Sequence, residues 1–189
     1  MSYESLKMLR RTLDEEDDEN SILFLLKVHH KYLKEFVILL SSSDIAIEHK
    51  QLTLTLFEKI FRMHALSEQE ILYKILNRST NREMRLQSLK TTDENDLAFE
   101  IIDELKVLNA ENIWTENIGS KIKVLSGLLK SHIKDEENIL FPLAEKHLTE
   151  SQLMDLTDEY IEKCKIHLDA ELAHYSSVVP KNDVASLIY

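Results

Sequence analysis

HALSEQEILY at residues 64–73 and HIKDEENILFP at residues 132–142 carry nearly the same pattern. Each stretch places a histidine four residues before a glutamate, and an Ile-Leu-aromatic triplet begins three residues after the glutamate. On a helix, residues four apart lie on one face, so each stretch directs an imidazole and a carboxylate to the same point. These two groups together bind borderline divalent metals. The repeated pattern therefore predicts a paired metal site inside a helical bundle.

The composition favours long helices and limits the classes of partner. Glycine and proline each occur only twice in 189 residues, whereas the two together make up ~12% of an average globular chain. The formal net charge of −11, with no strongly basic patch, disfavours nucleic acid and anionic membranes as partners. The single cysteine, Cys164, excludes an intrachain disulfide and a Cys-rich metal site. The sequence shows no signal-peptide apolar region and no apolar run of ~18 residues, so we expect a cytoplasmic protein.

Hydrophobic periodicity divides the chain into an acidic lead-in (1–20), a four-helix bundle (21–148) and a C-terminal helix with a tail that packs on the bundle (149–189). Apolar residues recur at three- and four-residue steps in five segments. The predicted helices span about 21–40, 45–76 (or 48–76), 93–108, 116–146 and 151–175. Pro142 should kink or end the fourth helix nearby. Four amphipathic helices with short links predict an all-α, antiparallel up-down bundle with one additional helix.

Three histidines and two glutamates fall in the apolar stripes of these helices. His30 lies in the stripe of the first helix, His64 and Glu68 in that of the second, and His132 and Glu136 in that of the fourth. A buried ionised carboxylate needs a proton, a partner or a cation. The alternative is that the glutamates lie at the stripe edges and pair with Lys or Arg, while the histidines are satisfied core residues. Three in-phase histidines on different helices favour the metal site. The stripes are expected to continue through Ile71, Ile75, Ile139 and Leu143.

Three segments carry a resemblance to a known family. They are LKVHHKYL at 26–33, the segment at 64–73, and VLSGLLKSHIKDEENILFP at 124–142. Over about residues 20–165 the chain resembles the hemerythrin-like, or HHE cation-binding, family, which implies a four-helix bundle around a carboxylate-bridged di-iron centre. By position, the resemblance implies metal ligands at His30, His64, Glu68, His132 and Glu136, with both glutamates bridging. His29 is the neighbour that would substitute for His30, although its phase fits the stripe less well.

The third predicted helix departs from this family. Family members usually supply a histidine there, often within a Glu-His-His sequence, but no histidine occurs between residues 64 and 132. Matching the sequences places Glu94-Asn95-Asp96 at that position, and helical phase selects Glu94 as a sixth candidate ligand. Glu94 also ends the sequence Thr91-Thr-Asp-Glu94, which is typical of a capping box at a helix start. Both roles therefore stay open for Glu94.

The resemblance implies a non-heme di-iron centre that binds or senses O2, NO or peroxide, or that handles iron; zinc and manganese are other metals for such a site. Fewer imidazoles and more carboxylates favour harder, more oxidised metal over reversible oxygen carriage. The second hypothesis is therefore a di-iron oxidase or a peroxide- or NO-reducing enzyme, and the third is a metal-free helical interaction module. The expected partner is a small diatomic ligand or peroxide, and the sequence names no protein partner. Leu33, Ile71 and Ile139 would exclude water, and Tyr73 would either hydrogen-bond behind a ligand or belong to the core.

Overall fold

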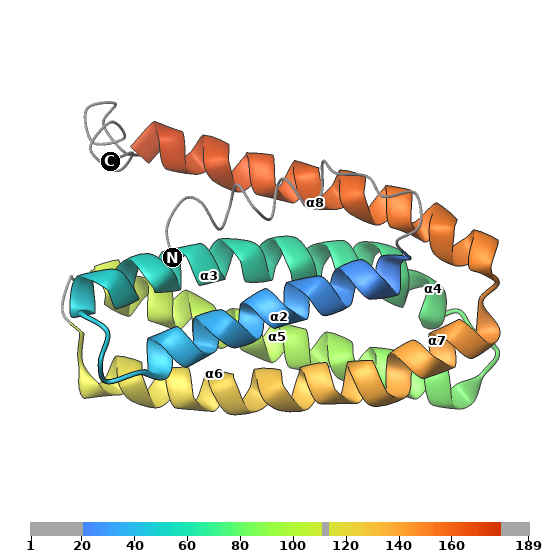
Figure 1. Ribbon diagram of the computed structural model, residues 1–189, viewed down its shortest axis with the longest axis horizontal. Coiled ribbons are helices and arrows are strands. Elements are labelled where there is room, and N and C mark those ends of the chain that lie inside the picture. Colours follow the sequence, from blue (N-terminus) through green and yellow to red (C-terminus); the bar gives the residue numbers. More distant parts are fainter. Residues whose placement is uncertain (1–20, 111–113, 179–189) are drawn as a thin grey trace.

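The computed structural model describes the backbone of residues 21–110 and 114–178, and the side chains of residues 21–109 and 114–168. The acidic lead-in predicted at 1–20 and the end of the C-terminal tail lie outside these residues. Every regular element in the described part of the chain is helical (Figure 1). In order, the elements are α2 (Ile22–Ser41), α3 (Ile47–Glu68), the π-helical turn η1 (Gln69–Tyr73), α4 (Lys74–Leu76), α5 (Arg82–Ala110), α6 (Glu116–Asp135), the π-helical turn η2 (Glu136–Leu140), α7 (Phe141–His147) and α8 (Glu150–Val178).

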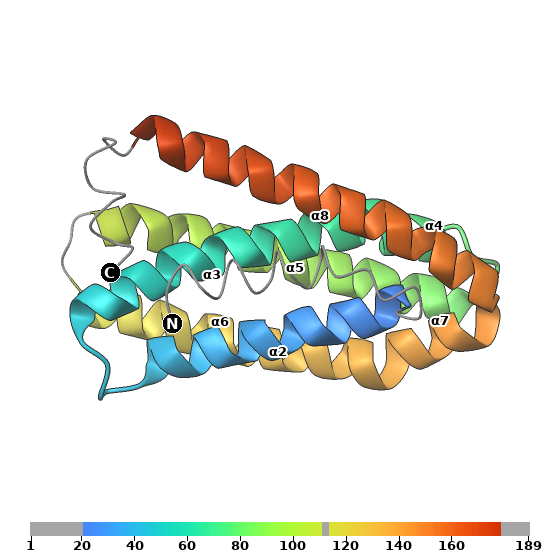
Figure 2. The same ribbon diagram turned by 45° about the horizontal axis from the view of Figure 1, so that its top comes forward.

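Four long helical segments form a bundle. They are α2, α3 with its continuation into α4, α5, and α6 with its continuation into α7 (Figure 1). Around the bundle, α2 packs against α3, α3 against α5, α5 against α6, and α6 against α2. Helix α8 lies outside the four and packs mainly on α3, with further contacts to α2 (Figure 2). This arrangement confirms the predicted all-α bundle with one additional helix.

The apolar stripes of the four segments meet in one core. On α2, the buried residues include Leu23, Leu26, His30, Leu33, Val37 and Leu40, which follow the predicted three- and four-residue steps. On α3, the rings of Phe57 and Phe61 stack with their centroids 5.9 Å apart, and both side chains are fully buried. Truncating such a phenylalanine to alanine costs ~3–5 kcal/mol. The histidine positions are therefore held inside a packed, apolar interior.

Helix α5 begins earlier than the sequence predicts. It starts at Arg82, not near residue 93. Asn81 caps it, because the Asn81 Oδ1 accepts a hydrogen bond from the backbone N–H of Met84 at 3.1 Å. The predicted capping box at 91–94 is wrong, since these residues lie inside the helix. The Thr91 hydroxyl instead donates to backbone carbonyls one turn earlier, those of Gln87 and Ser88.

A π-helical turn follows the histidine–glutamate pair in both repeated stretches. Turn η1 begins directly after Glu68, and η2 begins at Glu136. A π turn holds about one residue more than an α turn, so the buried stripe shifts by one position beyond it. Leu76 is fully buried while the predicted Ile75 is 38% exposed.

The same shift follows η2. Leu140 and Ala144 are fully buried, whereas the predicted Ile139 and Leu143 are only partly buried. The helix does not end at Pro142. Helix α7 begins one residue earlier, at Phe141, and carries the proline in its first turn. The predicted continuation is therefore confirmed at Ile71 but wrong by one residue at Ile75, Ile139 and Leu143. The predicted boundary near Pro142 falls at a change of helix type.

Candidate metal centre

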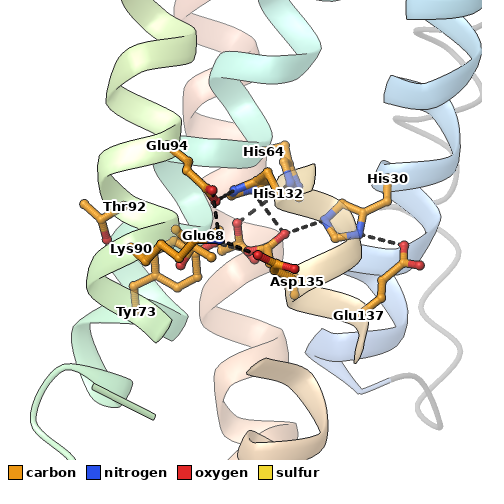
Figure 3. Close-up of polar contacts among 12 residues, drawn as sticks. His30, His64, Glu68, Tyr73, Lys90, Thr92, Glu94, His132, Asp135 and Glu137 are labelled. Atoms are coloured by element: carbon orange, nitrogen blue, oxygen red, sulfur yellow. Dashed lines mark hydrogen bonds and ion pairs between the residues drawn. The ribbon is translucent and has the colours of Figure 1, made fainter. Parts of the chain in front are cut away.

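The five ligands predicted from the helical stripes converge in the bundle interior. His30 comes from α2, His64 and Glu68 from the last turns of α3, His132 from α6, and Glu136 from the first residue of η2. All five side chains are at most 2% exposed. They form two groups, His30–His64–Glu68 and Glu68–His132–Glu136, and within each group one ligand atom per residue lies within 4.8 Å of the others. Glu68 belongs to both groups, and Figure 3 shows it with His30, His64 and His132 in the space between the helices.

The inward-facing atoms of this cluster have no hydrogen-bond partner. This applies to Nε2 of His30, His64 and His132, to both carboxylate oxygens of Glu68, and to Oε2 of Glu136. Most of them lie near an ionisable group of the opposite kind without a hydrogen bond: Glu136 Oε2 is 3.1 Å from His30 Nε2 and 3.2 Å from His132 Nε2, and Glu68 Oε2 is 3.8 Å from His64 Nε2. A buried polar atom without a hydrogen bond costs ~1–3 kcal/mol. A cation among these atoms would provide the missing partner for all of them.

The outward nitrogen of His30 is held by a carboxylate. His30 Nδ1 lies 3.0 Å from Glu137 Oε1 (Figure 3), and that same oxygen accepts a hydrogen bond from Lys34 Nζ at 3.1 Å. The ring of Phe141 stacks on the face of His30 with the centroids 5.7 Å apart and an interplanar angle of 11°. The imidazole is thereby fixed in position with Nε2 toward the centre.

The outward nitrogen of His132 is held in the same way from α5. His132 Nδ1 lies 3.2 Å from Glu94 Oε2, and Lys90 Nζ is 3.0 Å from the other Glu94 oxygen. Lys90 also pairs with Asp135. A carboxylate behind a metal-binding histidine fixes the tautomer and makes the ring a better ligand. Glu94 is therefore placed behind His132, and it belongs to neither group of ligand atoms.

A tyrosine from α8 holds the outward nitrogen of His64. His64 Nδ1 lies 3.2 Å from the Tyr160 hydroxyl, which also lies 2.7 Å from His29 Nδ1. All three side chains are buried. Burial and the neighbouring His30 lower the pKa of His29 to about 3, and burial also keeps the pKa of His64 well below 6.5. His29, the alternative to His30 in the sequence, belongs to neither group of ligand atoms.

Burial and mutual interaction separate the pKa values of the two glutamates. Burial and the nearby Glu136 raise the pKa of Glu68 well above its ordinary value of 4.5. Burial opposes the charged form of Glu136 as well, but His132 and His30 outweigh it and hold the pKa of Glu136 well below 4.5. Burial likewise works to lower the pKa of His132, but Glu136 and Glu94 raise it to about 10. Burial and Glu136 therefore favour the protonated form of Glu68, while His132 and Glu136 stabilise each other's charged forms.

Tyr73, the aromatic residue of the first repeated stretch, contacts the glutamate of the second. The Tyr73 hydroxyl donates a hydrogen bond to Glu136 Oε1. Burial and the charge of Glu136 raise the pKa of Tyr73 well above 10, so the phenol keeps its proton. Each aromatic residue of the repeated pattern therefore contacts a candidate ligand from another segment: Tyr73 donates to Glu136, and Phe141 stacks on His30.

Helix α5 turns Asn95, not Glu94, toward the interior. The buried residues of α5 at the level of the bundle core are Thr91, Asn95, Ala98, Ile102 and Leu105, at four- and three-residue steps. Asn95 is 1% exposed, and both polar atoms of its side chain lack a hydrogen-bond partner. The sequence did not single out Asn95, because the helical phase of this segment was taken from Ala98 and Ile101 together. Ile101 is only partly buried and does not mark the inward face. The spacing of Asn95, Ala98 and Ile102 is the signal that identifies it.

The comparisons agree with the sequence and with the fold. The family model described as the hemerythrin HHE cation binding domain matches residues 21–144. This range contains the five candidate ligands and ends before α8. Searches of curated proteins and of solved structures found no match. No helix in the described ranges combines the length and hydropathy needed to cross a membrane.

Proposed function

The chain belongs to the hemerythrin HHE cation-binding domain family, and on that premise we propose that it holds two bridged iron ions and binds or senses O2, NO or peroxide. The observation that carries this proposal is the set of unpartnered inward atoms on three histidines and two glutamates, arranged as two groups that share Glu68. Imidazole nitrogens and carboxylate oxygens are ligands that suit iron. Facing helices of a bundle supply metal sites of this kind.

Each residue of the cluster has a distinct role in this proposal. His30 and His64 would hold one iron and His132 the other, and Glu68, which belongs to both groups, would be shared between them. Glu136 would be shared as well, because its Oε2 lies within 3.2 Å of a nitrogen from each group. When bound, the pair would supply reversible ferrous–ferric chemistry and a coordination position for a small ligand. Among the apolar residues expected to exclude water, Leu33 and Ile71 are buried, whereas Ile139 is partly exposed.

Anaerobic reconstitution with ferrous iron tests the proposal. We expect two iron ions per chain by elemental analysis, and near-ultraviolet absorption of an oxo-bridged ferric pair after exposure to air. Less than one iron per chain, with no such absorption, would contradict it. A protein that stays metal-free under these conditions would support the third hypothesis, a helical interaction module.

A second candidate function, an oxidase or a peroxide- or NO-reducing enzyme, is supported by the proton donor beside the ligands. The buried Tyr73 hydroxyl donates to Glu136, and α5 places an amide rather than an imidazole in the interior. For this function we expect the iron-loaded protein to consume peroxide over many turnovers. The activity should be lost in Glu68→Ala and reduced in Tyr73→Phe. Stoichiometric ligand binding without consumption would contradict this candidate and favour the first.

Metal binding is expected to release protons. The pKa of about 10 keeps His132 protonated at neutral pH, and burial beside Glu136 raises the pKa of Glu68 and favours its protonated form. Both must lose a proton to bind metal. We therefore expect about two protons to be released per chain and metal affinity to rise with pH. Calorimetric titrations with Zn²⁺ at one pH, in buffers of different ionisation enthalpy, measure the number. A binding heat that is the same in every buffer would contradict it.

A further inference from the structure

We infer that α8 is part of the metal centre, and that Tyr160 is a positioning residue that fixes the tautomer and orientation of His64. This inference rests on the proposed function, because it concerns a ligand of the proposed centre. Tyr160 lies outside the residues that match the family model, which end at 144.

A common pattern among the three ligand histidines supports this role. Each one turns Nε2 inward, where it has no hydrogen-bond partner, and has Nδ1 within 3.2 Å of an oxygen behind it. For His30 and His132 that oxygen belongs to a glutamate paired with a lysine. For His64 it is the hydroxyl of Tyr160. Without Tyr160, His64 would lack the outer contact that the other two histidines have.

The directions of the hydrogen bonds follow from the chemistry of the three groups. For Nε2 of His64 to offer a lone pair to a metal, the ring must carry its proton on Nδ1. This N–H then donates to the Tyr160 oxygen, 3.2 Å away. The hydroxyl has a single proton, which it donates to His29 Nδ1 at 2.7 Å. His29 therefore carries its own proton on Nε2. The Cys164 thiol is also a neighbour of the Tyr160 hydroxyl, but sulfur is the weaker acceptor, so the hydroxyl proton is assigned to His29 when His64 binds metal.

The packing of α8 holds the hydroxyl in place. Tyr160 is fully buried, and Leu156 and Cys164, one turn away on either side, are also buried in the core cluster. Helix α8 packs on α3, the helix that carries His64 and Glu68. The phenol is therefore fixed by its helix rather than free to rotate away from the imidazole.

Tyr160→Phe tests the role, because it keeps the ring and removes the hydroxyl. Thr157→Val is the matched control: it removes another buried hydroxyl of α8, one that donates to the Leu153 carbonyl of the same helix. In a competition for Zn²⁺ against a chromophoric chelator, we expect Tyr160→Phe to bind ~10–100-fold more weakly than the wild type. Thr157→Val should change the affinity less than ~3-fold. Equal affinities for the wild type and Tyr160→Phe would overturn the inference.

Imidazole ¹⁵N spectra of the metal-free protein give a second measurement, which does not depend on metal. We expect His64 in the wild type to be neutral with its proton on Nδ1, and this preference to be lost in Tyr160→Phe. A proton on Nε2 of His64 in the wild type would overturn the inference. A wild type that has the Nδ1 proton but takes up no metal would contradict the proposed function while supporting the hydrogen-bond assignment.

A pair of substitutions at His29 tests the direction of the second hydrogen bond. In His29→Asn the amide oxygen can take the place of Nδ1 as acceptor, whereas His29→Leu leaves the Tyr160 hydroxyl only the weaker Cys164 sulfur. We expect Zn²⁺ binding by His29→Asn to stay close to that of the wild type and binding by His29→Leu to weaken. Equal weakening in both variants would overturn the assignment of His29 as the acceptor.

Discussion

Glu68→Gln is expected to lose metal binding at both positions while the metal-free protein becomes more stable. Glu68 belongs to both groups of ligand atoms, so replacing its carboxylate by an amide weakens both positions at once. Loss of an outer residue behind a ligand typically costs 10–100-fold in affinity, and we expect the loss of the shared ligand to exceed about 100-fold. Elemental analysis after iron reconstitution should find less than one metal per chain.

The gain in stability has an electrostatic cause. Burial and Glu136 raise the pKa of Glu68 well above 4.5, so this carboxyl must take up a proton on folding at neutral pH. The cost grows by about 1.4 kcal/mol for each pH unit above 4.5 until the pH reaches the pKa of the folded state, so it is at most about 3.5 kcal/mol at pH 7. Glutamine avoids the cost. The advantage of Glu68→Gln in the free energy of unfolding should therefore be largest near neutral pH and vanish as the pH falls toward 4.5.

Glu70→Gln is the matched control for both effects. Glu70 lies two residues further on, is 41% exposed and pairs with Lys163 at 2.7 Å. A surface pair of this kind contributes ~0–1 kcal/mol, so metal binding should be unchanged and stability should change little. Full metal loading of Glu68→Gln, or equal stability of Glu68→Gln and the wild type without metal at pH 7, would contradict the role assigned to Glu68.

Metal loading is expected to stabilise the wild type strongly. A ligand that binds only the folded state stabilises it by about 4 kcal/mol at a thousand times its Kd. For a chain of this size, that corresponds to a rise in Tm of roughly 8–16 °C. The physical source is the set of unpartnered inward atoms, which the cation would satisfy. Thermal unfolding followed by circular dichroism, with ferrous iron under anaerobic conditions and then with excess chelator, measures the rise and its reversal.

Two controls make the stability measurement specific. Glu68→Gln should show almost no rise in Tm with the same metal, whereas Glu70→Gln should respond as the wild type does. An unchanged Tm of the wild type in the presence of metal would contradict the proposed centre. The buried atoms without a hydrogen bond would then reduce the free energy of unfolding with no compensation from a metal.

The helices and the inward placement of the candidate ligands were predictable because they depend on average periodicity. The stripes of α2, α3 and α6 repeat every 3.6 residues over several turns, so His30, His64 and His132 could be placed on the inner face from the sequence. The buried apolar positions beyond the two glutamates were not predictable to the residue. A π turn adds one residue without a sequence signal of its own, and the burial of Leu76 in place of Ile75 is its consequence.

The outer partners were harder to predict than the ligands. Tyr160 approaches His64 across 96 residues of sequence, and no local pattern of α8 marks it as different from a core tyrosine. Glu137 and Glu94 could be read as solvent-facing charges, because each is only partly buried. Such contacts depend on how helices pack, whereas the ligand pattern depends on the turn of a single helix. The helical phase pointed to Glu94 rather than Asn95 for a third reason. It was counted partly from Ile101, which is only partly buried, whereas Asn95 is the residue that faces the interior.

The two groups that share Glu68 are chemically inequivalent. One combines two imidazoles with a carboxylate, and the other combines one imidazole with two carboxylates. Nitrogen-rich sites favour softer, later divalent metals, and carboxylate-rich sites favour harder ones such as manganese. We therefore expect ordered occupancy, in which a limiting amount of metal fills one position before the other. The same difference would let a single chain hold a mixed pair of metals.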